Sequence, residues 1–135
     1  MSQTSDFSLR PATVLDADRC WQILQQGKAQ MFREGKKQWT TTYPSRQSVE
    51  SDLEHGAAYV LERRGEVVAY GAVIFDGEPA YAQIEERWLT HGDYVVIHRL
   101  AVADEAKRQG VAREYFNQVM HMAAQRGVHS IKVDT

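Results

Sequence analysis

The sequence contains a single cysteine, Cys20, so no disulfide can form within the chain and a disulfide-framed secreted domain is excluded. Long apolar runs are absent as well, because no stretch approaches the roughly 20 residues that a membrane-spanning helix needs. The opening residues Met1 to Asp6 are polar, and the apolar segment of a signal peptide does not follow them. We therefore expect a cytoplasmic protein with a reduced thiol and no membrane partner.

A strong excess of one charge is also missing. The 16 Lys and Arg residues nearly balance the 18 Asp and Glu residues, and the net charge is −2. Non-specific nucleic-acid binding depends on clustered positive charge, so we expect no nucleic-acid partner. By contrast, 43% of the residues are hydrophobic, which is enough for a packed core. A length of 135 residues predicts one domain that spans residues 1–135.

The spacing of apolar residues and the positions of turn formers predict a mixed-sheet α/β (α+β) chain. The expected strands are residues 6–10, 57–63, 66–75, 94–102 and 128–133. The expected helices are residues 16–27, 45–56, 79–89 and 111–126. Asp16 is the expected N-cap of the first helix, and Ser45 with Ser48 supplies the capping chemistry of the second. The apolar face expected for the last helix consists of Val111, Tyr115, Val119, Met122 and Ala123. Arg64-Gly65 predicts a hairpin turn, and residues 31–43 are expected to form a loop or a broken helix. The order is β-α-α-β-β-(α)-β-α-β, and its last strand-helix-strand unit predicts a parallel pair.

The loop inside this last unit carries the clearest chemical signal. It is cationic, contains a glycine and leads into the N-terminus of a helix. Free backbone N–H groups and the positive end of the helix dipole make such a place an anion site, and basic side chains suit a pyrophosphate. The alternative is an ordinary solvated loop with a basic face. The residues concerned are Lys107, Arg108, Gly110, Ala112 and Arg113.

The same unit contains the runs His98-Arg99-Leu100-Ala101-Val102 and Lys107-Arg108-Gln109-Gly110-Val111-Ala112. Together they resemble the central motif of the GNAT acetyltransferases, a strand followed by Gln/Arg-x-x-Gly-x-Gly/Ala. Lys107 departs from the first position, where it keeps the charge of Arg without its planar side chain. Arg10-Pro11-Ala12 and the run 65–71 also fit the family's layout. The resemblance covers nearly the whole chain and implies the GNAT-like acyl-CoA N-acyltransferase fold.

This resemblance implies acetyl-CoA as cosubstrate and no metal. The backbone of the 98–102 strand would hydrogen-bond the pantetheine arm, and backbone N–H groups at the helix start would hold the pyrophosphate. The cofactor-binding residues so implied are Leu100, Ala101, Val102, Lys107, Arg108, Gln109, Gly110, Val111, Ala112 and Arg113. The acceptor would be a primary amine of a small molecule or an amino-acid-like molecule, which attacks the acetyl group directly.

His98 is the first candidate for the catalytic base, because its position resembles that of the histidine base of the arylalkylamine acetyltransferases. An interior, hydrogen-bonded histidine is an equally good interpretation. Val96 is apolar, so the glutamate base that some GNAT enzymes place there is not available. Glu85 and Glu86 are weaker candidates, since most glutamates on a short helix are simply solvated.

Two aromatic residues in the irregular segment, Trp39 and Tyr43, are the candidates for acceptor binding. An aromatic wall can accept an amine by cation–π contact, or equally an apolar side chain. Phe32 and Trp88 are expected instead to pack the helices on the sheet. Cys20 is expected to be a buried apolar residue and not a nucleophile.

GNAT domains normally continue beyond the strand near Val133 with a helix and two further strands, so the resemblance implies a C-terminally truncated domain. The last strand would then leave an open edge, which is a pairing liability. We therefore expect either a tight homodimer that covers this edge or a monomer of low stability. The alternative to an enzyme is a non-catalytic GNAT-like module that binds CoA or a protein, or an inactive fragment of an acetyltransferase.

Overall fold

The computed structural model describes residues 6–37, 39–75 and 94–134. Its strands are β1 Phe7–Pro11, β2 Ala58–Arg63, β3 Glu66–Phe75, β4 Val95–Val102 and β5 Ile131–Asp134. Its helices are α1 Ala17–Arg33, α2 Arg46–Glu54 and α4 Val111–Gln125, with short 3-10 turns η1 Val14–Asp16 and η2 Asp104–Ala106. The helix expected at residues 79–89, with Glu85, Glu86 and Trp88, lies outside the described residues.

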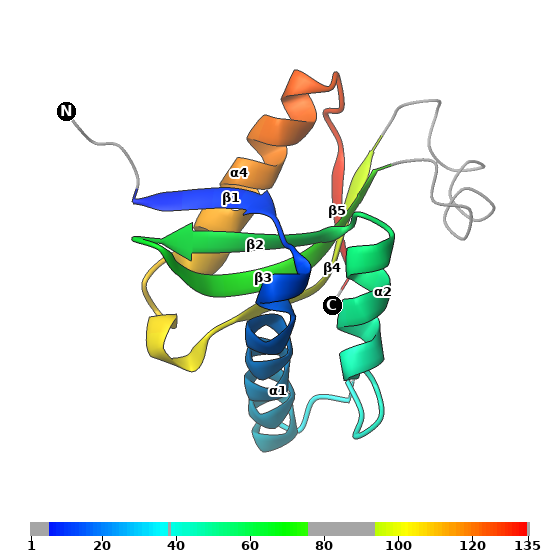
Figure 1. Cartoon of the computed structure of the whole chain (residues 1–135), viewed down its shortest axis with the longest axis vertical. Helices are drawn as coiled ribbons and strands as arrows, with labels where there is room; N and C mark the ends of the chain where they lie inside the picture. The colour runs from blue at the N-terminus through cyan, green and yellow to red at the C-terminus, as the bar shows by residue number, and fades with distance from the viewer. Residues whose placement is uncertain (1–5, 38, 76–93, 135) are drawn as a thin grey trace.

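The five strands form one mixed sheet in the sequential order β1-β2-β3-β4-β5. The pairs β1–β2, β2–β3 and β3–β4 are antiparallel, whereas β4 and β5 are parallel. The parallel pair is joined through α4, which confirms the predicted strand-helix-strand unit. Helices α1 and α2 cover one face of the sheet and α4 covers the other (Figure 1). The mixed α/β fold predicted from the sequence is therefore confirmed.

Helix α4 is positioned by an apolar stripe at helical spacing. The buried residues Val111, Tyr115, Val119 and Ala123 recur every four positions, so they share one side of the helix and pack on the sheet. The predicted face included these four residues. Gly127, with φ of 78°, follows the end of the helix, where glycine adopts the left-handed conformation without strain.

Two local signals are confirmed. Ser45 is the N-cap of α2, and its side chain and that of Ser48 form a reciprocal capping box, the arrangement that satisfies free N–H groups at a helix start. Arg64 and Gly65 have φ of 54° and 86°, so both adopt the left-handed conformation that a two-residue hairpin turn requires.

The predicted end of the first helix at Gly27 is wrong, because α1 continues to Arg33. The segment predicted as irregular from Met31 therefore begins inside the helix. Gly27 is not a helix stop: a Cβ built there would lie 3.0 Å from Cζ3 of Trp39. The glycine is explained by this close approach of another side chain, which no local pattern reveals.

The start of α1 differs in detail from the prediction. Asp16 is the N-cap residue by position, but its side chain makes no cap hydrogen bond to the helix. Its carboxylate instead accepts hydrogen bonds from the backbone N–H of Thr13 at 2.8 Å and from the Arg10 guanidinium at 2.8 and 3.0 Å. Asp16 therefore ties the end of β1 to the entry of α1. None of the helices in the described ranges has the length and apolar content that crossing a membrane requires.

Candidate acetyl-CoA site

Strand β4 bulges in its second half. Tyr70 of β3 is paired with Ala101, and Ala72 with His98, so two residues of β4, Arg99 and Leu100, oppose one residue of β3. Arg99 has φ of 56°, in the left-handed region that non-glycine residues rarely occupy. The bulge changes the direction of the strand at this point.

The bulge lies where β4 leaves β5. The parallel ladder joins Val95 to Ile131 and ends with His98 paired to Asp134. Among the residues that the structure describes, no strand covers this edge of β4 beyond His98. An uncovered strand edge presents N–H and C=O groups to an extended ligand. The predicted pantetheine-binding residues Leu100, Ala101 and Val102 lie on this stretch of β4.

A helix N-terminus lies next along the chain. Gly110, the N-cap of α4, has φ of 77°, and a Cβ built on it would meet no atom within 4 Å. The space above this residue is therefore open. The N–H groups of the first turn of α4 have no partner within the helix, and the helix dipole adds partial positive charge. This is the geometry of an anion site.

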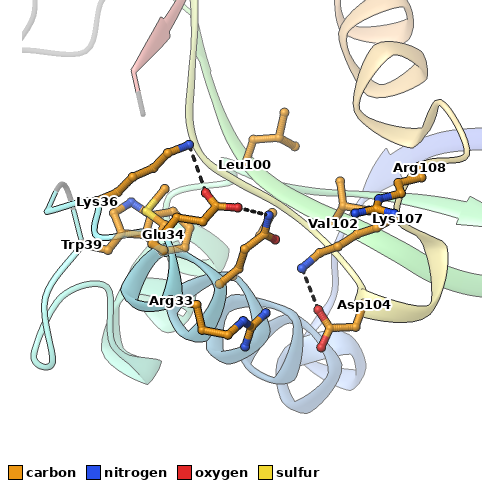
Figure 2. Close-up of a pocket in the computed structure, with 13 residues that line it drawn as sticks. Arg33, Glu34, Lys36, Trp39, Leu100, Val102, Asp104, Lys107 and Arg108 are labelled. Atoms are coloured by element: carbon orange, nitrogen blue, oxygen red, sulfur yellow. Dashed lines mark hydrogen bonds and ion pairs between the residues drawn. The ribbon is translucent and has the colours of Figure 1, made fainter.

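The uncovered edge of β4 and the cationic loop before α4 both line one pocket of about 670 Å³. Figure 2 shows the end of α1 and Trp39 on one side of it, with Leu100 and Val102 of β4 above and Lys107, Arg108 and Asp104 beyond them. The lining residues are Gly27, Gln30, Met31, Arg33, Glu34, Lys36, Trp39, Leu100, Ala101, Val102, Asp104, Lys107 and Arg108. Five of the ten predicted cofactor-binding residues are among them.

The pocket is electropositive. Four cationic side chains line it against two carboxylates. Lys107 pairs with Asp104 at 2.6 Å, and Lys36 pairs with Glu34 at 3.2 Å. Arg33 and Arg108 have no ion-pair partner within residues 6–37, 39–75 and 94–134. An anionic ligand therefore finds two uncompensated guanidinium groups, whose fork of donors suits phosphate oxygens.

The other five predicted cofactor-binding residues do not line this pocket with their side chains. Val111 is buried at 2% exposure in the core. The Gln109 amide bonds the Arg63 guanidinium and the Glu105 carbonyl. Ala112 and Arg113 are exposed on the first turn of α4. With Gly110, the N-cap, the residues Val111, Ala112 and Arg113 form the start of α4, and Gln109 precedes it.

The two predicted acceptor residues lie in different surroundings. Trp39 is 4% exposed; it packs against the position of Gly27 and lines the pocket just described. Tyr43 is 45% exposed, and its Oη accepts a hydrogen bond from Nη1 of Arg99 at 2.8 Å. The packing role predicted for Phe32 is wrong, because that side chain is 46% exposed.

Lys28 on α1 holds the loop that carries Tyr43. Its Nζ donates to the carbonyl oxygens of Thr41 at 3.1 Å and Pro44 at 2.7 Å. The side chain is almost fully covered, with 8% of the residue exposed, and burial lowers the pKa of Lys28. The helical extension beyond Gly27 thus gives the loop a fixed anchor.

His98, the predicted base, is half-buried near the middle of β4, where its backbone partners are Ala72 on one side and Asp134 on the other. It immediately precedes the bulge residue Arg99. Val96, two positions earlier, is buried at 1% exposure. His98 therefore lies at the point where β4 leaves β5, next to the open strand edge.

Sequence reasoning missed a buried polar cluster around Asp52 of α2. Asp52 is 5% exposed. Nε of Arg99 donates to its Oδ2 at 3.2 Å, Nη2 donates to its Oδ1, and the Tyr70 hydroxyl donates to Oδ2. The available signal was a polar residue three positions after the buried Val49, on the covered side of α2.

The cluster is electrostatically satisfied. Burial opposes the charge of the guanidinium, but the Asp52 carboxylate outweighs this effect and holds the pKa of Arg99 above its usual range. Burial, with the same carboxylate beside it, raises the pKa of the Tyr70 hydroxyl far above its usual value. Arg99 therefore stays charged, and Tyr70 stays a hydrogen-bond donor.

Comparison with known families supplies the decisive observation: the sequence model of the Acetyltransferase (GNAT) family matches residues 18–135. The chain belongs to the GNAT acetyltransferase family. The resemblance first seen in residues 98–112 is thereby confirmed. No curated protein sequence gives a significant match.

Solved GNAT structures share the fold of this GNAT chain. A GNAT-family acetyltransferase from Streptococcus agalactiae 2603 is 26% identical, with a TM-score of 0.74 over 85% of this chain and 69% of that one. A ribosomal-protein-alanine N-acetyltransferase from Brucella melitensis biovar Abortus 2308 is 15% identical, with a TM-score of 0.64 over 96% of this chain and 79% of that one. An aminoglycoside acetyltransferase from an uncultured soil metagenomic sample is 14% identical, with a TM-score of 0.61 over 96% and 77%.

Other expectations for this GNAT chain stay predictions, namely the homodimer, the cytoplasmic location and the roles of individual site residues. In the sheet as described, β5 is an edge strand, and Val133 on it is 42% exposed. Within the described ranges, His, Cys, Asp and Glu side chains form no group of three that could hold a metal ion.

Proposed function

We propose that this chain is an N-acetyltransferase that moves the acetyl group of acetyl-CoA to a primary amine of a small-molecule or amino-acid-like acceptor. One observation carries the proposal: the uncovered edge of β4 lines an electropositive pocket together with Lys107 and Arg108, which lie just before the N-terminus of α4 in the chain. Acetyl-CoA has amide groups for a strand edge and a pyrophosphate for a helix N-terminus, so its chemistry fits these residues in order.

The edge of β4, the basic loop and the start of α4 each bind a part of acetyl-CoA in this proposal. The backbone of Leu100, Ala101 and Val102 binds the pantetheine arm as an added strand would. The first N–H groups of α4, with Lys107 and Arg108, bind the pyrophosphate. Gly110 leaves the approach to these N–H groups open. Together these contacts orient the thioester toward His98.

The chemistry is direct transfer. Acetyl-CoA supplies an activated acetyl thioester; the amine nitrogen forms the new C–N bond, the C–S bond breaks, and CoA leaves as its thiolate. A backbone N–H of β4 stabilises the charge that develops on the acetyl oxygen. His98, directly or through water, takes the proton that the attacking amine loses, and that proton ultimately balances the thiolate.

The acceptor is an amine of unknown identity. Two structural neighbours bear names that refer to different acceptors, a ribosomal-protein alanine and an aminoglycoside, and both are 15% identical or less. At such low identity, structural similarity indicates the fold of this chain but not its acceptor. The proposal of a small amine rests on the sequence resemblance and on the exposed Tyr43 beside the bulge.

Binding and turnover are tested separately. Acetyl-CoA should raise the melting temperature, because a ligand that binds only the folded state adds about 2.7 kcal/mol of stability at 100 times its Kd. Release of CoA thiol with a panel of amines then tests transfer. Stabilisation without thiol release would favour the non-catalytic CoA-binding module. Absence of any stabilisation would show that the chain has no acetyl-CoA site.

Gly110 offers a sharp test of the site, because Gly127 is its matched control. Both residues are at an end of α4, with φ of 77° and 78°, and a Cβ at either position meets nothing within 4 Å. Valine at either position therefore introduces the same backbone strain, but only Gly110→Val places carbon atoms over the helix N-terminus. Gly110→Val should abolish acetyl-CoA binding at a concentration that saturates Gly127→Val. Equal affinities would show that the pyrophosphate lies elsewhere.

The proposed role of His98 is tested by the pH dependence of acetyl transfer. His98→Ala should lower kcat/KM by about 100-fold, the usual contribution of a general base, and should change the pH dependence of the rate. His98→Gln is the matched variant that keeps polarity and size. A pH–rate profile unchanged in both variants would exclude His98 from proton transfer.

A further inference from the structure

We propose that the buried Asp52–Arg99 ion pair is a positioning device that holds the bulge of β4 and thereby sets the strand edge on which acetyl-CoA lies. This inference rests on the proposed function. It gives a role in that function to two side chains that lie outside the pocket of the proposed cosubstrate.

The backbone of Arg99 has a conformation that needs support. Its φ of 56° is disfavoured for a long side chain, because the Cβ crowds the backbone. Such a conformation persists when surrounding contacts over-determine it. Glycine adopts it freely and occupies many bulges for that reason. The presence of arginine here therefore requires a contact of its side chain that compensates for the strain.

The side chain of Arg99 makes a two-point contact with Asp52. Its guanidinium bonds both carboxylate oxygens of Asp52, with 15% and 6% of the two side chains exposed. A two-point contact fixes orientation as well as distance. The Tyr70 hydroxyl bonds the same carboxylate, and Tyr70 pairs across the strands with Ala101, just past the bulge. The pair is therefore attached to both strands that form the bulge.

The bulge lies between the β5-paired part of β4 and the part that lines the proposed cosubstrate pocket. Arg99 follows His98, the last β4 residue paired with β5, and precedes Leu100, the first β4 residue that lines the proposed cosubstrate pocket. Arg99 itself lines a different pocket, of about 520 Å³, together with Asp52. If residue 99 returned to an extended conformation, the directions of His98 and Leu100 relative to one another would change.

Arg99 is also linked to the loop between α1 and α2. Nη1 of Arg99 donates to the Tyr43 hydroxyl at 2.8 Å, and Lys28 anchors the same loop through the Pro44 carbonyl. The guanidinium of this β4 residue thus has two hydrogen-bond partners from two other elements, Asp52 of α2 and Tyr43 of this loop. A simple apolar pair of similar size would pack as well, but it would not fix the direction of residue 99.

The test uses Asp52→Asn, which keeps the shape of the side chain and removes its charge. The matched control is Asp18→Asn, because Asp18 also pairs with an arginine, Arg46, but is 89% exposed. The acetyl-CoA Kd is measured by calorimetry at a temperature where circular dichroism shows each protein fully folded. We expect the Kd to rise about tenfold in Asp52→Asn, within the range of couplings for contacting groups, and to stay unchanged in Asp18→Asn.

A purely structural role would lower the melting temperature of Asp52→Asn without changing the Kd of its folded form, and that result would overturn the proposal. Arg99→Gly is the second variant, because glycine allows the bulge without the ion pair. It should fold and should also bind acetyl-CoA about tenfold more weakly, since the bulge is no longer held in one conformation. Wild-type affinity in folded Arg99→Gly overturns the proposal, and so does failure of both variants to fold.

Loss of the acetyl-CoA site and loss of the positioning role give different results. If the wild-type chain does not bind acetyl-CoA, the proposed function falls, and this inference falls with it. If the wild-type chain and Asp18→Asn bind but Asp52→Asn binds equally well, only the positioning role is lost. With any amine that proves to be an acceptor, kcat of Asp52→Asn at saturating acetyl-CoA should also fall, because the thioester is misplaced relative to His98.

Discussion

Gly27 and Trp39 are in direct contact: a Cβ on Gly27 would lie 3.0 Å from Cζ3 of the indole and 3.3 Å from Cβ of Ala101. The absence of a side chain at residue 27 therefore lets the indole lie between helix α1 and strand β4. This one contact connects the helix, the loop after it and the strand that lines the proposed acetyl-CoA pocket.

Gly27→Val should be destabilising, because the added carbons displace the indole of Trp39. Overpacking of this kind costs about 1–3 kcal/mol, to be measured by urea unfolding. Ala29→Val is the control on the same helix, since Ala29 is exposed and should lose only helix propensity, about 0.5 kcal/mol. If Gly27→Val and Ala29→Val lower the free energy of unfolding equally, Trp39 does not pack on Gly27.

Gly71→Ala should be destabilising for a related reason. A Cβ at Gly71, which faces the bulge, would lie 2.7 Å from the Tyr115 hydroxyl, and that hydroxyl donates to the Tyr59 carbonyl at 2.9 Å. We expect a loss of about 2–3 kcal/mol. Tyr115→Phe alone should cost about 1 kcal/mol for the lost hydrogen bond.

The double variant of Gly71 and Tyr115 supplies the check. Removing the hydroxyl makes room for the new methyl group, so the cost of Gly71→Ala should fall in the Tyr115→Phe background. Strict additivity of the two losses, measured by the same urea titrations, would contradict the contact.

Asp16→Asn should weaken the fold at neutral pH but not in acid. Hydrogen bonds from the Arg10 guanidinium, the largest effect, hold the pKa of Asp16 below its usual 3.8. Since the folded-state pKa is lower than the unfolded one, the carboxylate stabilises the fold above pH 3.8, and this contribution is lost as the pH falls through the folded value. The cost of Asp16→Asn should be about 1 kcal/mol at neutral pH.

The measurement for Asp16 is the free energy of unfolding as a function of pH. The difference in free energy of unfolding between wild type and Asp16→Asn should become smaller as the pH falls below 3.8. Asp6→Asn is the control, because Asp6 is exposed and pairs with an arginine that is 80% exposed; its cost should stay under about 0.5 kcal/mol. A gap independent of pH would show that the carboxylate charge is not what stabilises the fold.

Cys20 should be inert in the folded protein. It is fully buried, and burial raises the pKa of its thiol to about 12, so the reactive thiolate is scarce at mildly alkaline pH. A thiol reagent should label it only after denaturation. Because the folded-state pKa exceeds the usual 9.0, the neutral thiol stabilises the fold below pH 9.0, and this contribution is lost as the pH rises toward about 12. Rapid labelling of the native protein would contradict this burial.

Features that depend on neighbours in sequence could be predicted from the sequence. Ser45 with Ser48 indicated the start of a helix, and Arg64-Gly65 indicated a hairpin, because caps and turns are local hydrogen-bond and dihedral effects. The stripe through Val111 and Tyr115 indicated the face of α4 that the core covers. The position of the motif between a strand and a helix followed from the same signals, and with it the family.

Only the tertiary structure decided the features that depend on residues far apart in the chain. It showed that Gly27 makes room for Trp39 and does not end a helix, and that Asp52 is buried against Arg99, 47 positions away. Neither residue type announces such a partner: glycine usually marks a turn, and aspartate on a helix is usually solvated. Local preference sets the elements, but close approach and burial arise only when the elements pack, and they determine the shape of the strand at the proposed site.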